Sequence, residues 1–217
     1  MQFTGFTEET GSFLWELAFH NEKPWFEAHK ADFLRTVKEP FDALAKETLA
    51  LMQERLPNEP LSLHISRIYR DARRLFGRGP YKDHLWFTLW TGENRHNSPV
   101  FWFELSPSSY SYGVGFYTAT PEQMAAFRRY IDANPAEMER LAKRAAKSEF
   151  HLEGEEYKRP KKDVGSVLNP WYNRKWISLC AEHDHGGALY SPTLPTVLTE
   201  AFVSLLPVYR LLKRFPA

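Results

Sequence analysis

The sequence predicts an α+β fold: an antiparallel β-sheet of about four to six strands packed with N-terminal, middle and C-terminal helices. Apolar residues recur at helical spacing through residues 1–60, and apolar and aromatic runs typical of strands fill residues 61–118. Helical spacing and polar loops then occupy residues 119–217. Because the strands form one block between helices, an antiparallel sheet is favoured. The length of 217 residues fits a single globular domain, 1–217.

The first block is predicted to hold three helices. Thr7 precedes two glutamates, as an N-cap does, and Asn21 is expected to end the first helix. Pro24 suits the first turn of a second helix. Pro40 is expected to break or restart that helix, and the stretch from Pro57 ends the block.

The middle block is predicted to form the sheet. Aromatic residues are 15% of the chain, and most of this excess lies in the predicted strands, which makes it first a feature of the core. Ser106–Ser109 is a turn between two of the strands, so this pair is expected to form a hairpin. The predicted strands are Leu63–Tyr69, Leu85–Trp90, Val100–Leu105 and Tyr110–Tyr117.

The last block is predicted to return to helices. Thr120 with Gln123 forms a capping-box pattern, and Pro135 suits the first turn of another helix. Residues 148–175 are polar and are expected to be loops. Leu194–Leu206 is amphipathic and is predicted to dock on the sheet, with Pro207 kinking or ending the helix.

Several function classes are excluded by what the chain lacks. The single cysteine, Cys180, excludes a disulfide framework and a multi-cysteine zinc site, and its apolar surroundings predict a buried, inert thiol. The consecutive residues His183–His185 cannot all face one ion, so no metal site is predicted. No phosphate-binding, nucleophile-elbow or zinc-protease motif is present, so no cofactor is predicted. Without a signal peptide or membrane span, a cytoplasmic location is expected.

The net charge of +1 hides an uneven distribution. Residues 1–63 hold 6 basic and 11 acidic residues, whereas residues 64–96 hold 7 basic and 3 acidic residues. Within this second stretch, the eighteen residues Arg67–His84 contain five arginines, a lysine and a histidine. The sequence therefore points to one electropositive segment as its candidate site.

Arginine and lysine side chains bind phosphates and carboxylates, so this segment predicts a site for a small anionic ligand. His84 is the candidate proton donor or acceptor, and Asp71 and Tyr81 are further catalytic candidates. Gly113 and Gly115 are expected to let a ligand approach the sheet closely. The predicted ligand-binding residues are Arg67, Arg70, Arg73, Lys82, Gly113 and Gly115.

The same segment resembles a known family. Arg70-Asp71-Ala72-Arg73 followed by Pro80-Tyr81-Lys82-Asp83-His84 resembles the motifs of the bacterial and fungal proteins called domain of unknown function 2461. Pro24-Trp25-Phe26, the Gly113-Val114-Gly115 strand and Gly154 with Lys158-Arg159 resemble its other elements. The resemblance covers almost the whole chain and implies a fold and a candidate site. It implies no activity, because the family has none established.

One departure from the family pattern falls between the two motifs. Family members usually carry Phe-Ser-x-Asp-Lys there, whereas this chain has Arg74-Leu75-Phe76-Gly77-Arg78. A serine and an aspartate are missing and positive charge is added. If those residues act in relatives, this chain lacks that chemistry.

Other interpretations of the segment stay open at this point. Asp71 pairing with a neighbouring arginine would lock a turn without any ligand. Basic residues interleaved with aromatic ones are also typical of nucleic-acid binding, although the balanced total charge opposes this. A protein-interaction module without catalysis is a third alternative. The sequence leaves open whether the protein is an enzyme, its ligand and its oligomeric state.

Overall fold

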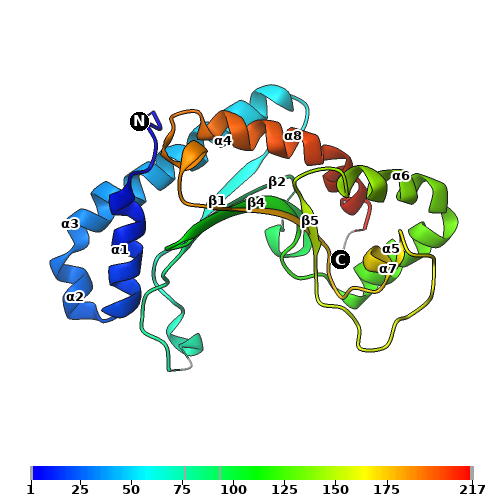
Figure 1. Cartoon of the computed structure of the whole chain (residues 1–217), viewed down its shortest axis with the longest axis horizontal. Coiled ribbons are helices and arrows are strands. Elements are labelled where there is room, and N and C mark those ends of the chain that lie inside the picture. The colour runs from blue at the N-terminus through cyan, green and yellow to red at the C-terminus, as the bar shows by residue number, and fades with distance from the viewer. Residues whose placement is uncertain (1, 76, 93, 216–217) are drawn as a thin grey trace. The chain divides into compact units, whose positions relative to one another are not determined.

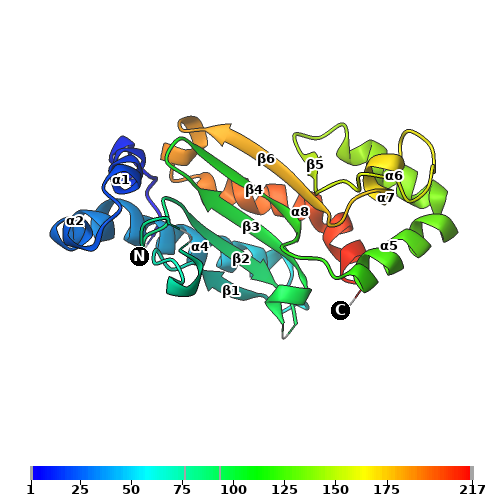
Figure 2. The ribbon, with the colours of Figure 1, turned by 90° about the horizontal axis from the view of Figure 1, so that it is seen from below.

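The structure is a computed structural model that describes residues 2–75, 77–92 and 94–215 (Figure 1). It confirms the predicted α+β class, because an antiparallel sheet of six described strands is combined with N-terminal, middle and C-terminal helices. The strand order is β1-β2-β3-β4-β6-β5 (Figure 2). The strands are β1 Ser62–Ile65, β2 Leu85–Trp90, β3 Pro99–Leu105, β4 Ser109–Phe116, β5 His151–Glu153 and β6 Ser178–Asp184.

The α-helices are α1 Glu8–Phe19, α2 Lys23–Ala28, α3 Lys30–Asp32, α4 Glu39–Arg55, α5 Pro121–Ala133, α6 Pro135–Ala145, α7 Asn169–Tyr172 and α8 Leu194–Leu212. Helices α1–α4 precede strands β1–β4, as predicted, whereas β5 and β6 alternate with the helices of the last block. No helix within the described ranges is both long and apolar enough to cross a membrane. A π-helical stretch, η1, covers Phe33–Lys38, and short 3₁₀ turns are η2 Ala72–Arg74, η3 Arg95–Asn97 and η4 Gly187–Tyr190.

The chain divides into two compact units, each built from separate stretches of sequence. Unit 1 consists of Met1–Leu89, Trp102–Ser111 and Glu182–Glu200. Unit 2 consists of Trp90–Phe101, Tyr112–Ala181 and Ala201–Ala217. Each unit is therefore held together by contacts between residues that are distant in the sequence.

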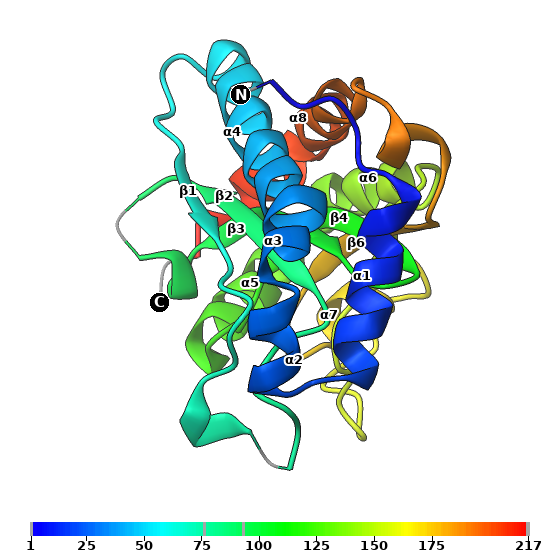
Figure 3. The same ribbon diagram turned by 90° about the vertical axis from the view of Figure 1, so that its left-hand side faces the viewer.

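At Pro40 the helix restarts, which is one of the two outcomes predicted for this proline: the π-helical stretch η1 gives way to α4 (Figure 3). Helix α4 follows η1 without a break, and Pro40 lies in the first turn of α4. Proline has no N–H, so it cannot donate to the carbonyl of Thr36 four residues earlier. That carbonyl instead accepts a hydrogen bond of 2.8 Å from the hydroxyl of Thr10, a residue of α1 that is 1% exposed. Because a partner from another helix satisfies the carbonyl, the helix continues.

The core of unit 1 forms where α4 covers one face of the sheet. The ring of Phe41 lies 5.9 Å from Phe87 and 5.9 Å from Phe103, and the latter two rings stack at 5.5 Å. All three side chains are fully buried. Aromatic rings bury more apolar area than other side chains, so this cluster is a main source of stability for the unit.

Unit 2 contains the hydrophobic end of α8. The ring of Tyr209 stacks on Phe101 at 4.4 Å, and its hydroxyl accepts a 2.9 Å hydrogen bond from the backbone N–H of Thr91. Helix α8 continues past Pro207, so the prediction that this proline could end the helix is wrong. At the other end of the unit, α5 starts with the predicted capping box of Thr120 and Gln123.

Regular structure also forms in stretches that were not predicted as helix or strand. The polar stretch 148–175, expected to be loops, contains β5 and α7, and a further strand, β6, covers Ser178–Asp184. In the structure β5 pairs antiparallel with β6, with His151 opposite Cys180. Short strands of this kind depend on their partner strand, so the sequence pattern alone does not reveal them.

Gly113 and Gly115 allow β4 to lie close to β6. A Cβ atom on Gly113 would overlap the carbonyl oxygen of Leu179, and one on Gly115 would overlap that of Ile177. The backbone of β6 therefore fills the space beside these two glycines, and their role here is to let the two strands approach each other.

We predict that Gly113→Ala lowers the free energy of unfolding by about 3 kcal/mol or more, because the added methyl group overpacks a backbone contact. The control is Gly92→Ala, where φ is +97° but nothing lies within 4 Å of the added atom. Backbone strain should lower the free energy of unfolding of that variant by only about 1–2 kcal/mol. Urea denaturation measures both, and equal losses would contradict the close approach of β4 to β6.

Candidate functional site

The electropositive segment is not a free loop. Its two arms, residues 66–70 and 80–86, pair with each other as an irregular extension of the sheet, with an isolated antiparallel bridge between Tyr69 and Tyr81. The tip between the arms carries the 3₁₀ turn η2. The backbone bonds are Ser66 N to Trp86 O at 2.8 Å, Lys82 N to Ile68 O at 2.7 Å and Arg70 N to Pro80 O at 2.8 Å.

Tyr81 anchors this segment in the core of unit 1. Its ring is 2% exposed and stacks on Phe26 at 4.1 Å. Burial, with smaller contributions from Tyr69 and Glu27, raises the pKa of the Tyr81 hydroxyl. The ring is therefore enclosed by protein, and its role here is to anchor the segment in the core.

The side-chain amide of Asn21 binds the backbone of Tyr81 in both directions. It donates to the Tyr81 carbonyl at 2.9 Å and accepts from the Tyr81 N–H at 2.9 Å. Gly79 leaves the room for this contact, since a Cβ atom there would overlap Asn21. The segment is thus fixed to the end of α1 by a pair of hydrogen bonds.

Arg70 links the two arms from the inside. Its side chain is only 15% exposed, and its Nε donates to the Tyr81 carbonyl at 2.7 Å. Its Nη2 lies 3.5 Å from a carboxylate oxygen of Asp83. A half-buried guanidinium with these partners holds the arms together and leaves positive charge at their base.

Asp71 and Arg73 form a local pair at the tip. Asp71 accepts a 3.0 Å hydrogen bond from the backbone N–H of Arg73 and caps η2. The Arg73 guanidinium donates to both carboxylate oxygens, at 3.0 and 2.7 Å, and the side chain is 87% exposed. This is the turn-locking pair that the sequence left open as an alternative. In the stretch that departs from the family pattern, residues 74–78, Phe76 lies outside the described residues.

Lys82 and His84 lie two residues apart on the second arm, and both interact electrostatically with Glu104 of β3. The Lys82 ammonium donates to the Arg67 carbonyl and lies 5.8 Å from the centre of the Trp86 ring. Partial burial, followed by repulsion from Arg70 and Arg67, lowers the pKa of Lys82, and only Glu104 acts in the opposite direction. We call Arg67, Arg70, Lys82 and His84 the basic cluster.

His84 is held by its neighbour in the chain. Its Nδ1 lies 2.9 Å from a carboxylate oxygen of Asp83, and its side chain is 31% exposed. Burial raises the pKa of Asp83, but the hydrogen bond from His84 and the charges of His84 and Arg70 outweigh it, so the pKa is lowered. The carboxylate is therefore charged at neutral pH and orients the imidazole.

Glu104 of β3 interacts electrostatically with Lys82 and His84 of the basic cluster, and it was not predicted as a site residue. Burial is the largest influence and raises the pKa of its carboxyl; Asp83 and Glu182 add to this, whereas His84 and Lys82 oppose it. The signal was present: Glu104 is a charged residue inside the apolar run Val100–Leu105. A charged residue in an otherwise apolar strand is a candidate site residue.

The histidines near the end of β6 have separate partners. His183 stacks on Tyr110 at 5.2 Å, whereas Nε2 of His185 lies 2.9 Å from the carbonyl oxygen of Ser106. Cys180 is 4% exposed, so the prediction of a buried thiol is confirmed.

Residues 9–210 match the model of the conserved hypothetical protein family DUF2461. The chain belongs to the DUF2461 family. No curated protein matches it. The DUF2461 description names no activity, so function has to be argued from the basic cluster and its surroundings.

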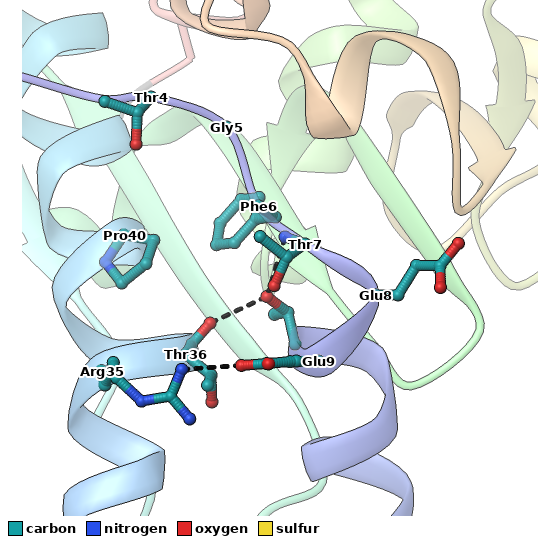
Figure 4. A pocket seen from close by; sticks show the side chains of 10 residues that line it. Thr4, Gly5, Phe6, Thr7, Glu8, Glu9, Arg35, Thr36 and Pro40 are labelled. Atoms are coloured by element: carbon teal, nitrogen blue, oxygen red, sulfur yellow. Dashed lines mark hydrogen bonds and ion pairs between the residues drawn. The ribbon is translucent and has the colours of Figure 1, made fainter.

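Unit 1 of this DUF2461 chain also contains an open pocket of about 570 Å³ (Figure 4). It lies between the start of α1 and the η1–α4 junction. The guanidinium of Arg35 is engaged by Glu9 at 2.7 Å and by Asp32 at 3.2 Å. Its charge is thereby neutralised, and this pocket offers no excess positive charge to an anion. Its lining is Thr4, Gly5, Phe6, Thr7, Glu8, Glu9, Thr10, Arg35, Thr36 and Pro40.

We predict that Glu104→Gln stabilises the DUF2461 fold near neutral pH. A carboxyl whose pKa is raised in the folded state favours folding below its unfolded value of 4.5, and this advantage is lost as the pH rises through the folded value. Glutamine does not ionise, so the variant should unfold at higher urea concentration near neutral pH and match the wild type below pH 4.5. Glu54→Gln, at an exposed position of α4, is the control. A wild type that is the more stable near neutral pH would contradict the burial of Glu104.

Proposed function

We propose that this protein binds a small anion, bearing a phosphate or carboxylate group, at the basic cluster. The observation that carries this proposal is the crowding of cations around Lys82. Burial is the largest cause of the lowered pKa of its ammonium, and repulsion by Arg70 and Arg67 lowers the pKa further. A bound anion would remove this repulsion and make charge-assisted hydrogen bonds, which are roughly twice as strong as neutral ones.

The balance of nearby charges supports an anion rather than a cation. Asp83 already lies beside Arg70 and His84. Glu104, the other acidic group that interacts with Lys82, has a raised pKa and holds its proton to higher pH. The charges of Arg67 and Lys82 therefore exceed the negative charge around them, as in sites that recognise phosphates and carboxylates.

His84 gives the proposed site a group able to move a proton. Imidazole is the side chain that titrates nearest to neutral pH without perturbation, and a carboxylate on one ring nitrogen orients the other for acid–base work. Asp83 stands in this relation to His84. We therefore keep His84 as the catalytic candidate. Asp71, Tyr81, Arg73 and the two strand glycines are left out of the proposed site.

We predict that Lys82→Gln weakens binding of inorganic phosphate or citrate about 10–100-fold at low ionic strength, because a hydrogen bond to a charged group is worth about 1.5–3 kcal/mol. Arg67→Gln should act in the same direction. Arg73→Gln is the matched control, since this arginine belongs to the same segment but is exposed and paired with Asp71. Isothermal titration calorimetry measures the affinities, and thermal unfolding checks that each variant is folded.

Two results would count against the proposal. One is the absence of saturable binding of phosphate and citrate by the wild type; the other is an equal loss of affinity in Lys82→Gln and Arg73→Gln. A labelled oligothymidine is titrated in parallel. Binding of the oligonucleotide that falls steeply with salt, without saturable phosphate binding, would assign the cluster to nucleic acid instead.

A further inference from the structure

We infer that His151, Glu153 and Cys180 form a binding site for a zinc-like transition-metal ion on the β5–β6 strand pair of unit 2. Strands β5 and β6 lie side by side (Figure 2). Their register places His151 of β5 directly opposite Cys180 of β6, and Glu153 is two residues further along β5. Residues two apart on a strand point to the same face, as do residues directly opposite each other on neighbouring strands. The three side chains therefore share one face.

The distances suit a single ion. One donor atom from each residue lies within 4.8 Å of the other two. Nε2 of His151 and a carboxylate oxygen of Glu153 are 3.2 Å apart. In a tetrahedral zinc site with bonds of roughly 2.0–2.3 Å, neighbouring ligand atoms are roughly 3.3–3.8 Å apart. The sulfur of Cys180 lies within 4.8 Å of the other two donor atoms, so an ion would draw the three atoms closer together.

The donor set favours zinc over the hard cations. A thiolate, an imidazole and a carboxylate are all ligands of zinc, whereas magnesium and calcium select oxygen. The thiolate and the carboxylate would balance a divalent charge. Three protein ligands leave one position for water, and the partly exposed His151 side chain gives solvent access to it.

The strand pair is held on both sides of the proposed site. Beyond β5, the N–H of Lys175 donates to the Glu155 carbonyl at 2.7 Å, and Glu156 and Arg174 form a further antiparallel bridge. On the other side of β6, Gly113 permits the close approach of β4 next to Cys180. A backbone fixed in this way positions the ligands before an ion arrives.

This site lies apart from the basic cluster in sequence and in chemistry. The proposed site does not include His183 or His185, which contact Tyr110 and Ser106. The sequence could not show it, because the two ligands on β5 and the one on β6 are separated by more than 25 residues and depend on a strand pairing that was not predicted.

The test is titration of the chelator-treated full-length protein with Zn²⁺ in a calorimeter. We expect one ion per chain, with affinity falling as pH is lowered, because thiol and imidazole must lose their protons. His151→Gln and Cys180→Ser should each weaken binding at least tenfold. Titration with Co²⁺ should give a thiolate-to-cobalt charge-transfer band, which Cys180→Ser abolishes.

Controls separate this site from adventitious binding. His96→Gln removes an exposed histidine elsewhere and should leave the affinity unchanged. Cys180 is buried, so circular dichroism checks that its variant folds; the exposed His151 supplies a second variant at low risk of unfolding. The inference is overturned if Zn²⁺ does not bind, if binding survives His151→Gln unchanged, or if the Co²⁺ complex shows no thiolate band.

Discussion

The anchoring of Tyr81 is the constraint on which the electropositive segment depends. The Tyr81 carbonyl accepts hydrogen bonds from the Asn21 amide and from Arg70, its N–H donates to the Asn21 side-chain oxygen, and its ring is stacked on Phe26. A residue buried in this way cannot move without exposing both an aromatic ring and polar backbone groups, and each carries a free-energy cost. Lys82 and His84 lie one and three residues after Tyr81 in the chain, so this anchor fixes where they lie.

This constraint also explains how a segment dense in cations remains folded. Repulsion among Arg67, Arg70 and Lys82 disfavours the paired arms, and the acidic groups Asp83 and Glu104 offset only part of it. The anchor at Tyr81 supplies the remaining stabilisation from apolar burial rather than from charge. Binding sites commonly hold such unfavourable charge arrangements, because the surrounding core stabilises them.

Much of the fold could be predicted from the sequence, because it depends on local residue patterns. Caps at Thr7 and Thr120 and the turn at Ser106–Ser109 each depend on residues near one another in the chain. The errors occurred where a distant partner decides the outcome. Strand β5 was expected to be loop, and it forms because it pairs with β6, which itself lies beside β4.

The candidate site shows the same division. Residue type and density identified the Arg67–His84 segment, but the direction of each side chain depends on which backbone groups pair. The sequence could not distinguish the enclosed Tyr81 or the exposed, paired Arg73 from the half-buried Lys82. It also could not connect Glu104 with this segment, because that requires the order of strands in the sheet. Composition locates a charged segment, and strand pairing decides which of its members act together.

The hydrogen bond from Thr10 to the Thr36 carbonyl has a consequence for the stability of the helices that it joins. In an uninterrupted helix that carbonyl would be satisfied four residues away, whereas here its partner is 26 residues distant. Pro40 cannot donate to this carbonyl, and the buried Thr10 hydroxyl does. The contact therefore ties α1 to the start of α4, so the stability of one helix is linked to that of the other.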